Sequence, residues 1–392
     1  MFQVARLGVI ALALILTSTT TMATEKMSTP RAAQKPHTVK SPFGERQDPW
    51  YWLRDDERQN PEMLAYLKAE NDHLAAVMAP HRELEQKIYD EIIGRLKQDD
   101  STVPQRRNGY WYYSRYETGK QYPIYARKKG SLEAAEEIII DGNARATGRE
   151  FYQLAELEVS VDGRWAAIAE DFVGRRQYEV RIKDLQSGEF LPDVLTNVEA
   201  NLAWANDNTT LLYIRKDPQT LLGNAVYKHR RGTEMTTDSL VYQQEDDSFY
   251  MGIGKSKTDR FLFIVSQSTV SSEYQYADAN DPALSFKVAL PRERDHEYQL
   301  EDIGDRFIIR TNWQAKNFRI VEVPIEKVAE RNRWRDVIAH RSDAFVDSFE
   351  AFDGFLAVSE RSGGLQNLRV HSRSTGESFL MAAADPAYTM YL

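Results

Sequence analysis

The amino-acid sequence predicts a mainly β fold, a β-propeller preceded by a short helical segment. Turn signals recur at intervals of 45 to 54 residues, each is followed by a short apolar run, and a more alternating strand follows each run. A radial array of four-stranded blades produces a period of this size. The six turn signals are Asn108-Gly109, Asp162-Gly163, Asp207-Asn208, Asp259-Arg260, Asp305-Arg306 and Asp353-Gly354.

The bulk composition is typical of a folded, strand-rich protein. The 392 residues exceed the roughly 250–300 that one hydrophobic core serves, so a repeat architecture or several domains are expected. The net charge of −9 argues against a nucleic-acid partner, because phosphate binding needs an excess of Lys and Arg. The absence of cysteine excludes disulfides, thiolate nucleophiles and Cys-ligated zinc.

Residues 1–23 resemble a signal peptide. Arg6 precedes an apolar run that is too short to span a membrane, and a cleavage site is expected after Ala23. This predicts a periplasmic or secreted protein with no membrane association after cleavage. The alternative is a cytoplasmic protein that starts at Met22 or Met27.

A loose linker is expected over 24–40, and a helical segment over 41–100. Asn60 is a good helix cap because it is followed by proline and an acid, and leucines then recur at helical spacing. A second apolar stripe follows. We therefore expect helices over about 61–79 and 82–98, each needing an apolar surface to pack against.

The propeller is expected over 101–392. Each turn signal precedes a nearly continuous apolar run, which indicates strands that are covered on both faces. A weak helical pattern over 325–333 is expected to be a surface insertion. The apolar runs lie at 110–113, 166–169, 211–214, 261–265, 307–309 and 355–358.

The segment around the Trp-Tyr-Trp sequence is the densest local signal. Adjacent aromatic side chains flanked by charges, outside the repeat array, are typical of an anchor that packs on another surface. We interpret it as a clasp between domains. Its candidate residues are Asp48, Trp50, Tyr51, Trp52 and Arg54.

One predicted blade loop carries four charges, at Glu170, Asp171, Arg175 and Arg176. Charges that are solvated at a loop are the usual explanation. The alternative is a cluster that faces another domain or a substrate.

Other motifs give no assembled active site. The segment Gly252–Ser256 lacks the earlier glycine of a phosphate loop, since that position is Phe249, and it reads as a glycine-rich strand and turn. The seven histidines are scattered and no His-Glu-x-x-His pair occurs. No Gly-x-Ser-x-Gly sequence marks a nucleophile. We therefore expect no metal and no cofactor.

An ordered series of motifs resembles the amino-terminal part of the oligopeptidase B group in the prolyl oligopeptidase family of serine peptidases. The likeness runs from about residue 41 to the end of the chain. The matching segments include 48–55, 66–71, 110–130, 141–143, 157–160, 169–178, 204–208, 215–218, 295–298, 315–318 and 363–365.

The resemblance implies a seven-bladed propeller that caps an α/β-hydrolase domain and restricts access to its Ser, Asp and His. It also implies cleavage of short peptides after Arg or Lys. In the family these groups lie beyond the position that matches Leu392, so no catalytic residue is assigned to this chain. We expect a truncated propeller of about six blades whose partner is the hydrolase half. The alternative is a stand-alone propeller that binds peptides or proteins without catalysis.

Overall fold

The computed structural model describes residues 28–392, and these divide into two compact units with the boundary between Lys97 and Gln98. The predicted signal peptide lies outside the described residues. From residue 28 onward, no helix combines the length and the apolarity that a membrane span requires.

The first unit begins with a small hairpin, in which β1 (Thr38–Ser41) pairs antiparallel with β2 (Gly44–Gln47). The loose linker expected up to residue 40 therefore ends earlier. Backbone hydrogen bonds cause this difference, because Lys35 N donates to Pro49 O and Asp48 N donates to His37 O. A short helical turn η1 (Tyr51–Leu53) follows the hairpin.

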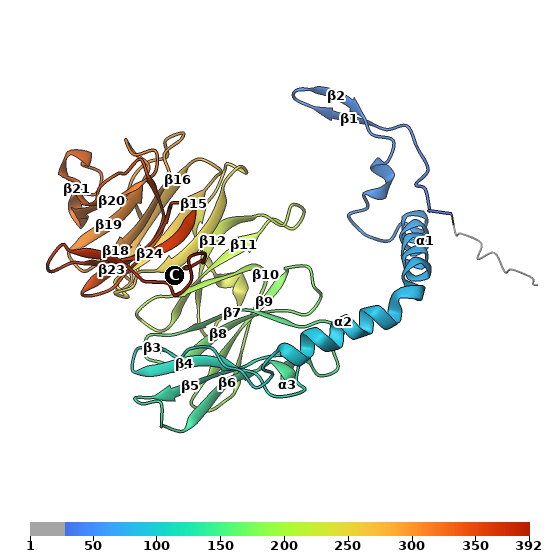
Figure 1. The fold of residues 1–392 in the computed structure, drawn as a ribbon, viewed down its shortest axis with the longest axis horizontal. Coiled ribbons are helices and arrows are strands. Elements are labelled where there is room, and N and C mark those ends of the chain that lie inside the picture. Colours follow the sequence, from blue (N-terminus) through green and yellow to red (C-terminus); the bar gives the residue numbers. More distant parts are fainter. Residues whose placement is uncertain (1–27) are drawn as a thin grey trace, which may run out of the picture. The chain divides into compact units, whose positions relative to one another are not determined.

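Two helices complete the first unit (Figure 1). Helix α1 (Pro61–Met78) begins where the sequence predicts, because the side chain of Asn60 accepts hydrogen bonds from the backbone amides of the first turn. Helix α2 (Arg82–Arg95) follows the turn η2 (Ala79–His81), which contains the proline that ends α1. Both predicted helices are confirmed.

The second unit is a series of antiparallel hairpins that form six blades, as predicted (Figure 1). The first strand of each blade precedes a turn signal, and the second strand is the predicted apolar run. The short helical turns η4 (Ile325–Lys327) and η5 (Arg331–Arg333) lie at the predicted insertion. The strands of blades one, four, five and six are β3 (Gln105–Arg107), β4 (Tyr110–Arg115), β5 (Ile124–Lys129) and β6 (Glu136–Asp141); β14 (Tyr250–Lys255), β15 (Phe261–Gln267), β16 (Ser272–Asp278) and β17 (Lys287–Val288); β18 (Tyr298–Asp302), β19 (Arg306–Thr311), β20 (Arg319–Pro324) and β21 (Arg335–Ile338); and β22 (Ala344–Ala351), β23 (Phe355–Ser362), β24 (Leu365–Ser372) and β25 (Ser378–Leu380).

Blades two and three form one seven-stranded sheet, which the repeat pattern does not predict. The long strand β10 (Phe190–Trp204) closes blade two and then opens blade three, pairing with β9 through its first half and with β11 through its second. Its register shifts near Asn197 and Val198. The other strands of this sheet are β7 (Gln153–Val159), β8 (Trp165–Asp171), β9 (Tyr178–Asp184), β11 (Thr210–Lys216), β12 (Gly223–Arg230) and β13 (Ser239–Gln243).

The turn signals hold the first hairpin of each blade and also join neighbouring blades. Several adopt the left-handed backbone conformation, with φ of 46° at Asn108, 56° at Asn208 and 59° at Asp259. The Asn208 side chain accepts a hydrogen bond from Asp162 N at 3.0 Å, and Asn206 donates to Asp259 O at 3.0 Å. These turns therefore act as links between blades two, three and four.

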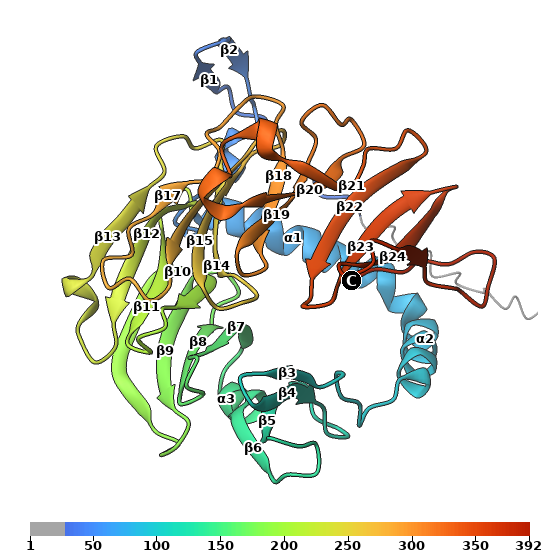
Figure 2. The ribbon, with the colours of Figure 1, turned by 90° about the vertical axis from the view of Figure 1, so that its left-hand side faces the viewer.

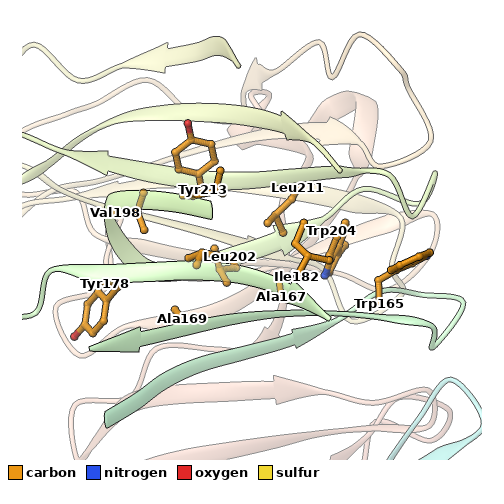
Figure 3. Packing of buried hydrophobic residues seen from close by; sticks show 12 residues of the cluster. Trp165, Ala167, Ala169, Tyr178, Ile182, Val198, Leu202, Trp204, Leu211 and Tyr213 are labelled. Atoms are coloured by element: carbon orange, nitrogen blue, oxygen red, sulfur yellow. The ribbon is translucent and has the colours of Figure 1, made fainter. Parts of the chain in front are cut away.

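The hydrophobic cores lie between the blades, so the arc is held by blade-on-blade packing. The core of blades two and three contains Trp204 and Tyr213, which are fully buried (Figure 3). In Figure 2 the strands of this unit follow an arc from β3–β6 to β22–β24. Strand β4 at one end of the arc is only half-buried, unlike β8, β11 and β15, which are mostly buried.

Candidate functional site

The first strands of neighbouring blades contact one another, β7 with β10 and β10 with β14. Together with β3 they line a polar cavity of about 570 Å³, which we call the channel cavity. In one wall of the cavity, Asn201 on β10 is bonded to the backbone of β14. Its side chain donates to Ile253 O at 3.0 Å and accepts from Ile253 N at 2.5 Å. The charged residues of the lining are Arg106, Arg107, Glu156, Glu158, Lys255, Lys257 and Asp259.

An ion-pair network joins blades one, two and four across the channel cavity. Arg107 lies 3.4 Å from Glu158 Oε2 and 3.6 Å from Asp259 Oδ1. Lys255 Nζ lies 3.9 Å from the same Asp259 oxygen, and Asn108 donates to Asp259 Oδ2 at 3.4 Å. Asp259 is therefore shared by two cations, neither of which it holds at direct hydrogen-bond distance.

A second network joins blade four to blades five and six. Lys257 Nζ lies 2.5 Å from Glu350 Oε2 on β22. The backbone amide of Lys257 donates to Glu301 Oε1 at 3.1 Å. Burial raises the pKa of Glu301 to about 7, which makes this carboxyl group responsive near neutral pH.

Burial also changes the charge states in the channel cavity. It lowers the pKa of Lys255 to about 8, even though Asp259 favours the charged ammonium. Burial raises the pKa of Glu158 although Arg107 opposes this shift, and it raises the pKa of Glu156 as well. The two glutamates are thereby shifted toward neutrality and the lysine stays cationic below about pH 8.

A second cavity of about 360 Å³ lies between blades one and two, and we call it the side pocket. Its lining combines aromatic and aliphatic side chains, including Tyr112, Tyr125 and Leu157. The two cavities adjoin, because both are lined by Gln105, Arg107, Asn108 and Val159.

The clasp candidates contact the start of the described chain in their own unit. Trp52 Nε1 donates to Ala33 O at 2.8 Å, and Lys35 Nζ lies 4.5 Å from the ring centre of Trp52. Tyr51 stacks on His37 with 3.9 Å between ring centres. These aromatic rings therefore order residues that the sequence analysis assigned to a linker.

The other clasp candidates are polar or exposed. Asp48 accepts hydrogen bonds from Trp50 N and from Arg46, and Arg54 pairs with Asp56. Trp50 is 47% exposed. Docking of a further domain on this segment stays a prediction.

Two of the four charged side chains in this loop are buried, whereas the sequence predicts charges that are solvated. Glu170 is fully buried and forms a bidentate ion pair with Arg145, with distances of 2.8 Å and 2.5 Å. Asp171 is also fully buried and accepts backbone hydrogen bonds from Val173, Gly174 and Arg176. The two acids thus organise the loop itself. Of the two arginines, Arg175 is half-buried and Arg176 is exposed.

The glycine-rich segment Gly252–Ser256 is a strand and turn, as the sequence predicts. Gly252, Gly254 and Lys255 all belong to β14, which pairs in regular register with β15. No helix follows, so the geometry of a phosphate loop is absent from this segment.

Sequence reasoning missed a buried cluster around His229. Its Nε2 lies 2.9 Å from Asp193 Oδ1 and its Nδ1 lies 2.8 Å from Asp238 Oδ1. Tyr213 completes the cluster by donating to Asp238 Oδ2 at 3.0 Å. No spacing rule marks these residues, because the three blade segments meet only in the folded sheet. Within the described residues, no group of three or more potential ligands is arranged to hold a metal.

A match to a protein-family model shows which family this chain belongs to. The family model described as "Prolyl oligopeptidase, N-terminal beta-propeller domain" matches residues 30–392. The chain belongs to the prolyl oligopeptidase family. This agrees with the family resemblance of the sequence motifs and with the mainly β fold.

Relatives within the prolyl oligopeptidase family are about twice as long as this chain. Dipeptidyl aminopeptidase BI of Pseudoxanthomonas mexicana is 48% identical over 97% of this chain and 55% of its own length. Protease 2 of Moraxella lacunata is 28% identical over 93% of this chain and 53% of its own length. The structure of oligopeptidase B from Leishmania major is similar with a TM-score of 0.87 and 26% identity, covering 92% of this chain and 54% of that one.

Proposed function

We propose that the chain is the access-controlling propeller part of a serine peptidase that cleaves short peptides after Arg or Lys. The family match over residues 30–392 carries this proposal. The likeness to oligopeptidase B supports cleavage after the basic residues Arg and Lys. The partner would be an α/β-hydrolase half that supplies the Ser, Asp and His. A narrow propeller would admit flexible peptides and exclude folded proteins.

A second activity is favoured by the 48% identity to a dipeptidyl aminopeptidase. Such an enzyme would need a free amino terminus on its substrate, whereas an oligopeptidase would accept a blocked one. The two candidates share the propeller and the proposed hydrolase half, and they differ in which end of the peptide is recognised.

The first test uses the purified chain alone with two chromogenic peptides, both ending in Arg, one with a free and one with a blocked amino terminus. We predict no turnover of either, because acyl transfer needs an activated nucleophile and this chain contains no Gly-x-Ser-x-Gly sequence. Turnover together with labelling of this chain by a serine-directed phosphonate would contradict the proposal.

The second test adds, as a separate polypeptide, the part of the Pseudoxanthomonas relative that this chain does not cover. Turnover of the blocked peptide would support an oligopeptidase. Turnover of the free peptide alone would favour the dipeptidyl aminopeptidase.

A further inference from the structure

A buried lysine in the wall of the channel cavity has no hydrogen-bond acceptor among the described residues. Lys255 ends β14, and its side chain is only 7% exposed. Its Nζ forms no hydrogen bond in the described chain, and the carboxylate of its ion pair with Asp259 is 3.9 Å away. An ammonium group with three unused donors in a buried site is unfavourable, so the site favours a ligand that brings oxygen atoms.

The surrounding charges favour an anionic ligand. Asp259 is the shared ion-pair partner of Arg107 and Lys255. Its Oδ1 lies 3.6 Å from the Arg107 guanidinium and 3.9 Å from Lys255 Nζ. Arg106 also lines the cavity, and the described residues provide no ion-pair partner for it. The flexible stem of a lysine lets its ammonium turn toward a ligand in the cavity.

The acidic residues of the lining offset this positive charge only in part. Glu158 lies 3.4 Å from Arg107, and Glu156 has no cationic partner in the described chain. Burial raises the pKa of both carboxyl groups, which favours their neutral form relative to an exposed glutamate. The lining of the channel cavity as a whole carries four basic side chains against three acidic ones.

The side pocket indicates which second group the anionic ligand should carry. Tyr112, Tyr125, Ile139 and Leu157 give it an apolar lining, and its volume of about 360 Å³ suits a large side chain. Since Arg107 lines both cavities, a carboxylate in one and an apolar side chain in the other would lie close together. A peptide ending in a large apolar residue has this combination.

We propose that the two cavities bind the C-terminal residue of a short peptide, with its carboxylate at Lys255 and Arg107 and its side chain in the side pocket. The choice of a peptide rests on the proposed function. Binding itself needs no catalytic group, so it can fail or succeed independently of peptidase activity.

The proposed binding depends on pH in a defined direction. The charged groups that act on Lys255 are Asp259, Arg107, Glu158 and Asp207, and the pKa of Lys255 is about 8. Above this pH the ammonium loses its charge, so affinity for a carboxylate should fall between pH 7 and pH 9.

Isothermal titration of the full chain with Gly-Gly-Phe, its C-terminal amide and Gly-Gly-Gly tests the proposal without any variant. We expect the free acid to bind about tenfold or more tightly than the amide, because a charge-assisted hydrogen bond is lost. We expect a similar advantage over Gly-Gly-Gly, because the apolar side chain is missing. Equal affinities, no binding of the free acid, or displacement by equimolar inorganic phosphate would overturn the proposal.

A variant pair locates the site. Lys255→Met should weaken binding of Gly-Gly-Phe about tenfold or more, whereas Lys287→Met makes the same change on the exposed outer strand of the same blade and should leave it unchanged. Melting temperatures of both variants separate loss of binding from loss of fold. Unchanged affinity in a folded Lys255→Met variant would show that the peptide binds elsewhere.

Discussion

Glu170 shows how a single charged side chain is accommodated inside a blade. It is fully buried, and its two oxygens are both engaged by Arg145, which is partly exposed. A buried carboxylate of this kind is stable only while its partner remains, because an unpaired charge in a buried site carries a large desolvation cost.

Replacing Arg145 should therefore strongly destabilise the propeller. We expect Arg145→Met to lower the free energy of unfolding by about 3–5 kcal/mol, measured by urea denaturation. Lys327→Met is the control, because it removes an exposed ion pair with Glu330 and should change stability by less than about 1 kcal/mol. Equal effects of the two substitutions would show that Glu170 does not depend on its partner.

The His229 cluster should make stability depend on pH. Burial of the ring opposes its charged form, but the hydrogen bonds to Asp238 and Asp193 outweigh this, and the pKa of His229 is raised above 6.5. A raised folded pKa means that the stabilisation is complete below about pH 6.5 and is lost as the pH rises through the folded value.

The corresponding prediction compares His229→Gln with the unmodified chain. The variant should be less stable by about 3–5 kcal/mol at pH 6, because two buried carboxylates lose their cation. The difference should shrink toward pH 9. His340→Gln, at an exposed position, should show no such difference at either pH. A gap that grows with pH would contradict the assigned direction.

Contacts between side chains that are far apart in the chain were the feature that the sequence predicted least well. The turn residues at Asn108, Asp162 and Asp259 could be predicted because their conformational preference is local. The pairing of Arg107 with Asp259, or of His229 with Asp193, could not be predicted, since each joins segments that only the blade packing brings together.

At the scale of single elements, β10 is the feature that couples two blades. Its first half completes blade two and its second half begins blade three, and the change of register falls where Asn197 adopts a φ of 56°. The Asn197 side chain also donates to Lys216 O at 2.9 Å on the neighbouring strand. The hairpins were predictable from their turns, but this shared strand was not, because no glycine or turn pair separates its halves.

Substitution of Asn197 tests this account of β10. Asn197→Val should destabilise the propeller by about 1–3 kcal/mol, because a β-branched residue resists a positive φ and the hydrogen bond is lost. Asn197→Gly should cost less, since glycine adopts the same backbone conformation freely. Denaturation midpoints that rank the two variants in the opposite order would mean that the backbone conformation is not the controlling factor.

At the scale of the whole molecule, large apolar surfaces are exposed on the helices. The helical periodicity predicted apolar stripes that need a partner, and the described residues leave Leu74, Leu84, Ile88, Ile92 and Leu96 each about half or more exposed. Exposed apolar patches of this kind are typical of interaction surfaces. The chain also spans about half the length of the curated relatives it matches.

We therefore predict that the purified chain self-associates and binds a hydrophobic dye. Replacing Ile88 and Ile92 by lysine should reduce dye fluorescence and shift the chain toward a monomer in size-exclusion chromatography. Gln86 and Asp90 have the same four-residue spacing, and lysine at these exposed positions should change neither property. A monodisperse monomer that binds no dye would instead favour a stand-alone propeller.

The proposed dependence of this propeller on an α/β-hydrolase half is tested by reconstitution. The chain is mixed with the part of the Pseudoxanthomonas relative that it does not cover, and turnover of the two Arg peptides, the melting temperature and size are recorded together. We expect a one-to-one complex, a higher melting temperature and turnover that neither polypeptide shows alone. Turnover by this chain alone, or a mixture in which the two polypeptides neither associate nor change in activity, would contradict it.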